Sequence, residues 1–256
     1  MIRLARLTLT ALAALMLLGC AGHNPAEFSK PQPALASDIN LEIGIDHLRK
    51  GNLSQAKEKI DRALEQNPRN ANAHAAAGLL YDRLGEVKKA DGHFDRAIAL
   101  DGKNPDIANN YAAFLCKNNR YERGEKFALQ AASNPLYKTP EIGLVNAGNC
   151  MRSAGNLVKA EEHYRRALRL KPRFGSALYE MAEIELKQAN YLSARGFLER
   201  YLEVSRTSPA TLWLGTRIER GLGNRDGAYN YEQRLKNEYP NAPETRELLK
   251  LERNPG

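Results

Sequence analysis

Cysteine is the residue type in this chain whose chemistry depends most on spacing, and the chain has three, Cys20, Cys116 and Cys150. Two thiols separated by two residues are typical of redox enzymes, and no Cys-x-x-Cys occurs. The metalloprotease, phosphate-loop and serine-hydrolase signatures, His-Glu-x-x-His, Gly-x-x-x-x-Gly-Lys-Ser/Thr and Gly-x-Ser-x-Gly, are missing as well. We therefore expect no enzyme activity, no cofactor and no metal site.

The sequence around Cys20 indicates covalent attachment of lipid. Arg3 and Arg6 precede a run of apolar or threonine residues from 7 to 18, which is the layout of a secretory signal. This run is too short to cross a bilayer as a helix, which needs ~20 residues. The closing residues Leu17-Leu18-Gly19-Cys20 resemble the bacterial lipobox, in which the signal is cleaved just before a lipid-modified cysteine. An ordinary signal peptide that happens to end beside a cysteine is the alternative.

A lipid on Cys20 would anchor the mature protein without a membrane-spanning helix. Ala21, rather than an aspartate, follows the cysteine, and in the sorting pattern of such lipoproteins this indicates release to the outer membrane. We expect residues 1–19 to be the signal peptide and residues 20–36, which contain Pro25, Pro31 and Pro33, to be the lipidated cysteine and a flexible tether. The predicted location is the periplasmic face of the outer membrane.

Charge adds little to this picture. The formal net charge is +8, and it falls to +6 when the signal peptide is removed with Arg3 and Arg6. The basic residues are interleaved with acidic ones and an exported chain does not meet nucleic acid, so we expect no nucleic-acid partner and no small-molecule substrate. One basic cluster would either meet an acidic partner or lipid head groups, or form a solvated helix face: Arg165, Arg166, Arg169, Lys171 and Arg173.

The elements that position these residues repeat every 34 residues. A turn followed by a small residue recurs at 51, 85, 119, 155, 189 and 223, and the one longer step is explained by two extra residues near Thr139-Pro140. Within each unit, small residues recur at positions 8, 20 and 27 and larger ones at 4, 7, 11 and 24, the pattern of tetratricopeptide repeats. We predict an all-α, right-handed superhelix of six helix-turn-helix units, 37–70, 71–104, 105–138, 141–174, 175–208 and 209–242, closed by a capping helix and tail in 243–256.

This arrangement brings the remaining two cysteines together. Cys116 and Cys150 fall on the first helices of units three and four, and first helices of adjacent units run side by side in such arrays. In an oxidising periplasm we expect a disulfide between them. Two buried free thiols that behave as small apolar residues are the alternative.

The same first helices would line the concave face of the superhelix and bind a partner protein. Asparagine amides there offer both a donor and an acceptor to the backbone of an extended peptide, and aromatic side chains would anchor it. The candidate binding residues are Asn109, Asn110, Val145, Asn146, Asn149, Tyr179 and Trp213. Alternatively, Asn110 bonds within its own turn and Trp213 belongs to the core.

The lipobox, the tether, the six repeats and the segments 109–116, 134–141 and 146–150 together resemble the PilW (PilF) family of type IV pilus biogenesis lipoproteins over essentially the whole chain. The resemblance implies an outer-membrane pilotin, which delivers or stabilises the secretin ring through which the pilus leaves the cell. Secretin subunits would then be the partner, and part of the family has a disulfide matching Cys116 and Cys150.

A second hypothesis shares the anchor and the repeats. In this case the protein is a periplasmic lipoprotein scaffold that recruits cell-wall hydrolases or proteases. The two hypotheses differ in the effect of deletion, because loss of a pilotin removes secretin multimers and loss of such a scaffold leaves them intact.

Overall fold

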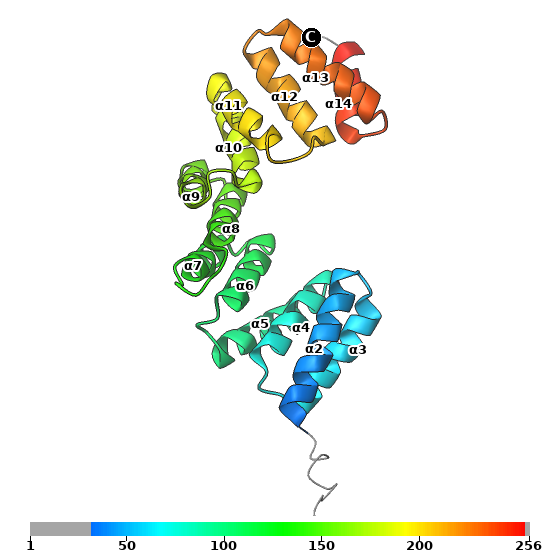
Figure 1. Cartoon of the computed structure of the whole chain (residues 1–256), viewed down its shortest axis with the longest axis vertical. Coiled ribbons are helices and arrows are strands. Elements are labelled where there is room, and N and C mark those ends of the chain that lie inside the picture. Colours follow the sequence, from blue (N-terminus) through cyan, green and yellow to red (C-terminus); the bar gives the residue numbers. More distant parts are fainter. Residues whose placement is uncertain (1–31, 254–256) are drawn as a thin grey trace, which may run out of the picture.

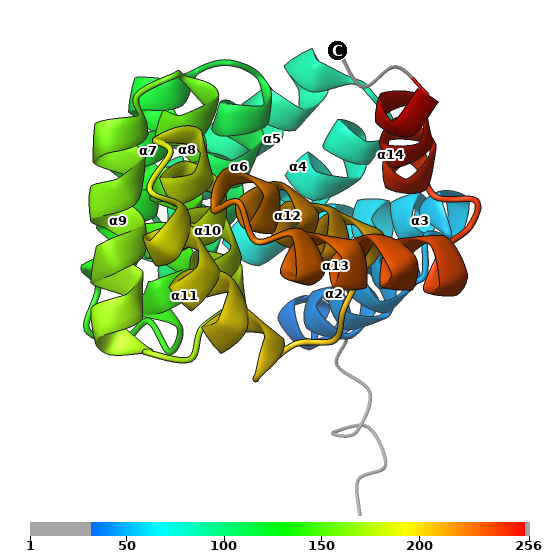
Figure 2. The same ribbon diagram turned by 90° about the horizontal axis from the view of Figure 1, so that it is seen from above.

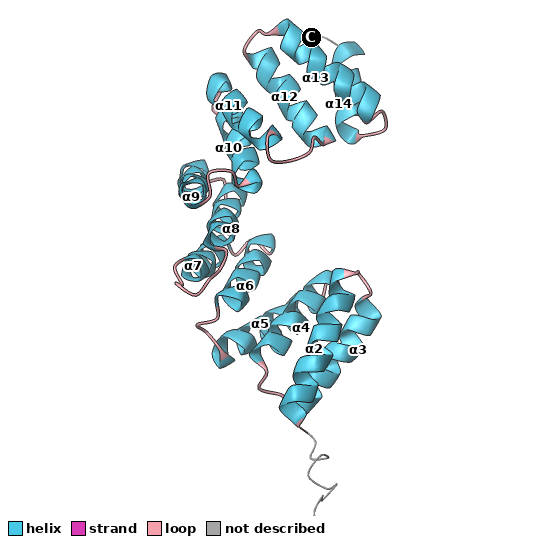
Figure 3. Ribbon diagram, viewed as in Figure 1, coloured by secondary structure: helices cyan, strands magenta, loops and turns pink. Residues whose placement is uncertain are grey.

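The computed structural model describes residues 32–253, and every regular element in that range is a helix (Figure 1 and Figure 3). The predicted all-α class is confirmed. The helices are α2 (Pro33–Arg49), α3 (Leu53–Gln66), α4 (Ala71–Arg83), α5 (Val87–Leu100), α6 (Pro105–Lys117), α7 (Tyr121–Ala132), α8 (Pro140–Ser153), α9 (Leu157–Leu170), α10 (Gly175–Lys187), α11 (Tyr191–Leu202), α12 (Pro209–Gly221), α13 (Arg225–Glu238) and α14 (Pro243–Arg253).

The turn inside each unit has the same backbone geometry. One residue adopts a left-handed conformation, with φ between 59° and 80°, at Gly51, Gly85, Asn119, Gly155, Ala189 and Gly223. The next residue donates its N–H to a carbonyl five residues earlier, as Asn156 does to Met151 at 2.8 Å. This is the Schellman arrangement that ends a helix and satisfies its last carbonyls. The turns found in the sequence are therefore helix ends.

Small residues allow the two helices of a unit to cross closely. At position 8 the backbone of Gly44 faces Ile60, that of Gly78 faces Phe94 and that of Gly148 faces Tyr164. A Cβ at Gly44 would lie 2.8 Å from Ile60 Cγ1, closer than real carbon atoms approach. A glycine at this position therefore lets the large side chain at position 24 lie directly on the opposite helix.

Unit six achieves the same packing one residue earlier. Gly215, at position 7, faces Tyr231 at position 23, while Thr216 at position 8 is buried and donates its hydroxyl to the carbonyl of Leu212 at 3.0 Å. Glu232, the residue at position 24, instead pairs with Arg220 at the surface. The departure of this unit from the sequence pattern is thus a one-residue shift of the contact along both helices.

The units stack into a curved array. First helices pack on first helices for α2 with α4, α4 with α6, α6 with α8 and α10 with α12, whereas the main neighbour of α10 outside its own unit is α9. Figure 1 shows α7 and α9 on the outer side of the curve, and Figure 2, seen from above, shows the helices following one another around the long axis. The chain therefore forms a superhelical array of paired helices with a concave side lined by first helices.

The two ends of the described chain differ. At the C-terminal end α14 covers unit six, and its Leu248 is fully buried with Leu212 and Leu235. At the other end α2 begins at Pro33, four residues before the predicted start of unit one, so the last residues of the predicted tether 20–36 are helical. Proline is favoured at the first helical position because its missing N–H would have no partner there.

Residues 1–31 and 254–256 lie outside the described range. The predicted signal peptide 1–19, the lipidation site Cys20 and most of the tether belong to that part of the chain. Within residues 32–253, no helix combines the length and the apolar character needed to cross a membrane.

Candidate partner-binding face

A groove opens on the concave side where α10 diverges from α8. It has a volume of about 790 Å3 and is lined by residues of α8, α10, the end of α11 and the start of α12. Four predicted binding residues line it together: Val145, Asn146 and Asn149 from α8 and Tyr179 from α10. They meet because positions 5, 6 and 9 lie on the inner face of the first helix of each unit.

An amide pair forms the edge of this groove. Asn146 Nδ2 donates to Asn109 Oδ1 at 2.8 Å, which joins the first helices of units three and four. Asn149 Oδ1 accepts a hydrogen bond from the Tyr164 hydroxyl at 2.7 Å. Each amide carries two donor hydrogens and an acceptor oxygen, and these bonds use only part of that capacity. The asparagines are therefore fixed in orientation and still able to bond a peptide backbone.

The charged lining residue of the groove, Glu180, and the charged residues beside it are paired inside the protein. Arg152 Nε lies 3.0 Å from Glu180 Oε2, and Arg217 Nη2 donates to Glu183 Oε1 at 2.9 Å. Burial raises the pKa of Glu180, and Arg152 opposes the effect. Burial and the neighbouring Glu183 raise the pKa of Tyr179 to about 12, so its hydroxyl stays protonated and donates to Glu183 at 3.2 Å. Shape and hydrogen bonds, rather than net charge, are what this groove offers a partner.

The structure places two predicted binding residues elsewhere. Asn110 lines a separate groove of about 700 Å3 formed with residues of α2 and α4. Trp213 is half-buried, packs against the cluster of Leu212, Leu235 and Leu248, and lies under the Arg217 guanidinium. Trp213 therefore serves the core of unit six in part, as the alternative interpretation of the sequence allowed.

Cys116 on α6 and Cys150 on α8 form a disulfide, with their Cα atoms 5.1 Å apart. Gly124 on α7 lies directly against both sulfur atoms, and a Cβ at this position would collide with them. The cross-link joins the same two helices as the Asn109–Asn146 bond. It therefore fixes the spacing of α6 and α8 beside the groove.

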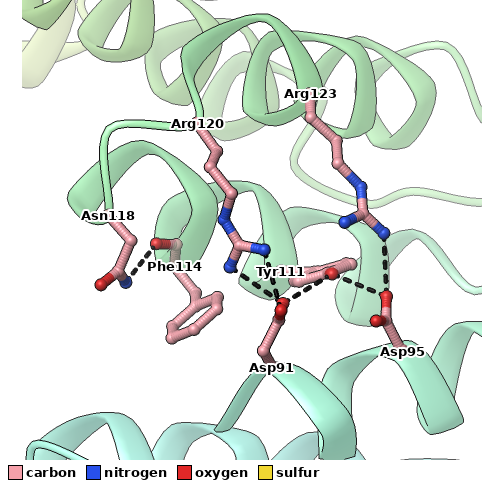
Figure 4. Close-up of polar contacts among 7 residues, drawn as sticks. All are labelled: Asp91, Asp95, Tyr111, Phe114, Asn118, Arg120 and Arg123. Atoms are coloured by element: carbon pink, nitrogen blue, oxygen red, sulfur yellow. Dashed lines mark hydrogen bonds and ion pairs between the residues drawn. The ribbon is translucent and has the colours of Figure 1, made fainter. Parts of the chain in front are cut away.

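Sequence analysis missed a set of polar contacts between consecutive units. In Figure 4 the Tyr111 hydroxyl oxygen lies 2.9 Å from Asp91 Oδ1 and 2.7 Å from Asp95 Oδ1, and the guanidinium groups of Arg120 and Arg123 pair with the same two carboxylates. Burial and these carboxylates raise the pKa of Tyr111 well above its ordinary value. The contacts hold α5 against α6 and α7 and form no open site.

His163 takes part in a second set of polar contacts, which joins α7 to α9. Its Nε2 lies 2.8 Å from Glu125 Oε1, and Lys159 Nζ lies 3.1 Å from Glu125 Oε2. His163 is buried, and the three residues join α7 to α9. Across residues 32–253, no three His, Cys, Asp or Glu side chains are grouped as a metal site requires.

Comparison with known proteins identifies relatives for this arrangement. Tetratricopeptide-repeat family models match residues 41–105, 148–210 and 93–126. The type IV pilus assembly protein PilF of Pseudomonas aeruginosa is 31% identical over 246 residues, which cover 95% of this chain and 97% of PilF.

Two solved structures share the fold at similar identity. The structure of P. aeruginosa PilF superposes with a TM-score of 0.76 at 30% identity. The superposition covers 86% of this chain and 99% of the PilF chain. PilW, described as a widely conserved type IV pilus biogenesis factor, gives a TM-score of 0.78 at 29% identity, with 86% of this chain and all of PilW covered. The likeness therefore extends along nearly the whole array.

Proposed function

Because the chain belongs to the PilF and PilW family of tetratricopeptide-repeat proteins of type IV pilus biogenesis, we propose that it is an outer-membrane lipoprotein pilotin. In this role it binds subunits of the pilus secretin and promotes their localisation and multimerisation in the outer membrane. The observation that carries the proposal is the similarity to PilF along 95% of the chain. A pilus protein made of helical repeats acts through protein partners, and the secretin is the partner we propose.

The concave groove supplies the binding surface in this proposal. Val145 and Tyr179 offer apolar contact, and Asn146 and Asn149 offer hydrogen bonds to the backbone of an extended segment of the partner. The disulfide and the Asn109–Asn146 bond hold α6 and α8 in place before the partner arrives. Binding to such a prepared surface loses less conformational entropy than binding to a surface that must first be ordered.

Lipid on Cys20 supplies the location in this proposal. Pro33, the first residue of α2, lies thirteen positions after Cys20. Even a fully extended chain of that length reaches only about 45 Å. An acylated Cys20 would therefore hold the array, and any secretin subunit bound to it, close to the membrane in which the secretin assembles.

Two variants in a deletion strain test the proposal. Cys20→Ser removes the acylated residue, so the folded protein should move to the soluble periplasmic fraction and secretin multimers should fall to the level of the deletion strain. Ala21→Asp is the matched control, since it keeps the lipid and should retain the protein in the inner membrane according to the sorting pattern.

Fractionation followed by immunoblotting of unboiled secretin measures both effects. Normal secretin multimers in the deletion strain would overturn the pilotin proposal. A Cys20→Ser protein that stays with the outer membrane would overturn the lipid anchor. The deletion strain would then still test whether secretin multimers depend on this protein.

A further inference from the structure

A shallow pocket on the outer side of the array combines positive charge with an apolar floor. It lies between α9 and α11, has a volume of about 260 Å3, and is lined by Arg165, Leu168, Arg169, Phe197 and Arg200. We call it the arginine pocket. Figure 1 shows α9 on the outer side of the curve.

Phe197 organises the charges of this pocket. The guanidinium carbon of Arg165 lies 5.9 Å from the centre of the Phe197 ring, and that of Arg200 lies 5.6 Å from it. Leu168, only 9% exposed, completes the floor. The ring attracts both guanidinium groups by the cation–π interaction and so keeps both charges beside the apolar floor.

The three arginines differ in how far the protein already satisfies them. Arg165 pairs with Glu161 at 2.8 Å and with Glu185 at 2.9 Å. Arg200 Nη2 donates to the carbonyl of Pro172 at 2.7 Å, a bond that leaves its charge unneutralised. Arg169 is exposed and makes no ion pair with any residue of the described range 32–253. The pocket therefore retains an excess of positive charge.

We propose that the arginine pocket binds an acidic segment of a second protein, with one large apolar side chain on Leu168 and Phe197 and flanking carboxylates on Arg169 and Arg200. Carboxylates suit these donors because a guanidinium bonds both oxygens of one carboxylate at once. The concave groove, whose charges are paired, would bind a different segment of the same partner or a different partner. The array would then hold two proteins, or two parts of one protein, on opposite faces.

The position of the pocket favours a protein over the membrane surface. α2, from which the chain leads back to Cys20, lies at one end of the array, and Figure 1 shows α9 and α11 well away from it along the long axis. The floor also accommodates a side chain rather than a head group alone. Anionic lipid is therefore the alternative that the experiment must separate.

Fluorescence anisotropy with a labelled peptide tests the proposal on the folded periplasmic protein. The probe is a short peptide of glutamate, serine and glycine with one central leucine. Matched probes replace its glutamates by glutamine or its leucine by serine. We expect the acidic probe to bind and each matched probe to bind about tenfold more weakly, the effect of losing one charge-assisted hydrogen bond or one buried side chain.

Protein variants locate the site. Arg169→Glu should weaken binding of the acidic probe at least about tenfold. Arg96→Glu on α5, an exposed arginine on another outer helix, should change nothing. Asn146→Ala in the concave groove should also leave this binding intact, so failure here is distinct from failure of the pilotin proposal.

Two results would overturn the proposal. One is that the acidic probe does not bind the wild type, or that Arg96→Glu weakens its binding as much as Arg169→Glu does. The other is binding of the wild type to vesicles containing anionic phospholipid, lost with Arg169→Glu, while the peptide does not bind, because this result assigns the pocket to lipid.

Discussion

At the scale of single residues, the turn between α10 and α11 has an alanine where four of the equivalent turns have glycine. Ala189 adopts a φ of 59°, in the left-handed region. A side chain with a Cβ pays roughly 1–2 kcal/mol for that conformation, and glycine does not. The turn pattern in the sequence located this residue correctly, but only the backbone angle shows that alanine is strained there.

We predict that Ala189→Gly stabilises the protein by about 1 kcal/mol, after allowance for the larger entropy that glycine loses on folding. Urea unfolding followed by circular dichroism measures the change. The reciprocal control is Gly155→Ala, at a φ of 80° with open space around the Cβ position, which should destabilise the protein by a similar amount. A destabilised Ala189→Gly variant would contradict the account of this turn.

Gly148 requires glycine for a different reason: its backbone is helical, but another side chain lies too close for a Cβ. A Cβ at this position would overlap the ring of Tyr164, which is fully buried. Gly148→Ala should therefore destabilise the protein by about 1–3 kcal/mol through overpacking. Gly196→Ala on α11 is the control, because nothing lies within 4 Å of its Cβ position, and it should stabilise by about 0.5–1 kcal/mol. Equal effects of the two changes in thermal unfolding would refute the packing argument.

The binding residues show where sequence reasoning reaches its limit at this scale. Repeat position alone placed Val145, Asn146, Asn149 and Tyr179 on the inner face, and the structure brings all four to one groove. Repeat position could not show that Trp213 packs against Leu212, Leu235 and Leu248, because that contact depends on α13 and α14. It could not place Asn110 in a separate groove either, since that groove depends on the curve of the array.

At the scale of helices, the 34-residue period predicted the helix pairs but not the polar contacts between them. The small residues recur at fixed positions because every crossing needs the same close approach. The ion pairs do not recur in this way. Asp91, Glu125 and Arg195 all occupy position 21 of their units, yet one of them is basic and two are acidic. Their partners Arg120, His163 and Glu219 occupy positions 16, 23 and 11. Their partners become visible only once the helices are in place.

Glu125 makes the contact between α7 and α9 sensitive to acid. Burial raises the pKa of its carboxyl, but hydrogen bonds from His163 and Lys159 outweigh burial and hold that pKa below its usual 4.5. A group whose pKa is lowered by folding stabilises the native state above its unfolded pKa and loses this contribution as the pH falls through its folded value. The contact should therefore weaken in acid below about pH 4.5.

We predict that Glu125→Gln lowers the free energy of unfolding by about 1–2 kcal/mol at neutral pH, because hydrogen bonds to a charged group are lost. The difference from wild type should shrink as the pH falls below the usual glutamate pKa. Denaturant unfolding across this range measures it, with Glu162→Gln, an exposed residue on α9, as the control. A difference that grows in acid would have the wrong sign for this account.

The disulfide acts on a second pair of helices, α6 and α8. It closes a loop with a sequence separation of 34 residues. By the loop-entropy estimate, replacing both cysteines by serine should cost about 3–4 kcal/mol. Hydrogen exchange should increase most in α6 and α8, and reducing agent should lower the stability of the wild type only. If reductant does not affect the wild type, the bond contributes nothing to stability.

At the scale of the whole molecule, curvature creates features that no single unit contains. The inner groove lies where α10, outside its own unit, packs mainly on α9 rather than on α8, and the arginine pocket lies between α9 and α11. Repeat counting predicts that an inner and an outer face exist. It does not predict where along the array either face opens, since that depends on small differences in packing between units.

The claim on which this account depends most is that the inner groove binds the secretin. The direct measurement is crosslinking in living, piliated cells from a photoreactive amino acid at position 146, with the same amino acid at exposed position 126 on the outer helix α7 as the control. Secretin subunits captured from position 146 and not from position 126 are the predicted result. Secretin captured equally from both positions, or from neither while pili still assemble, would contradict it.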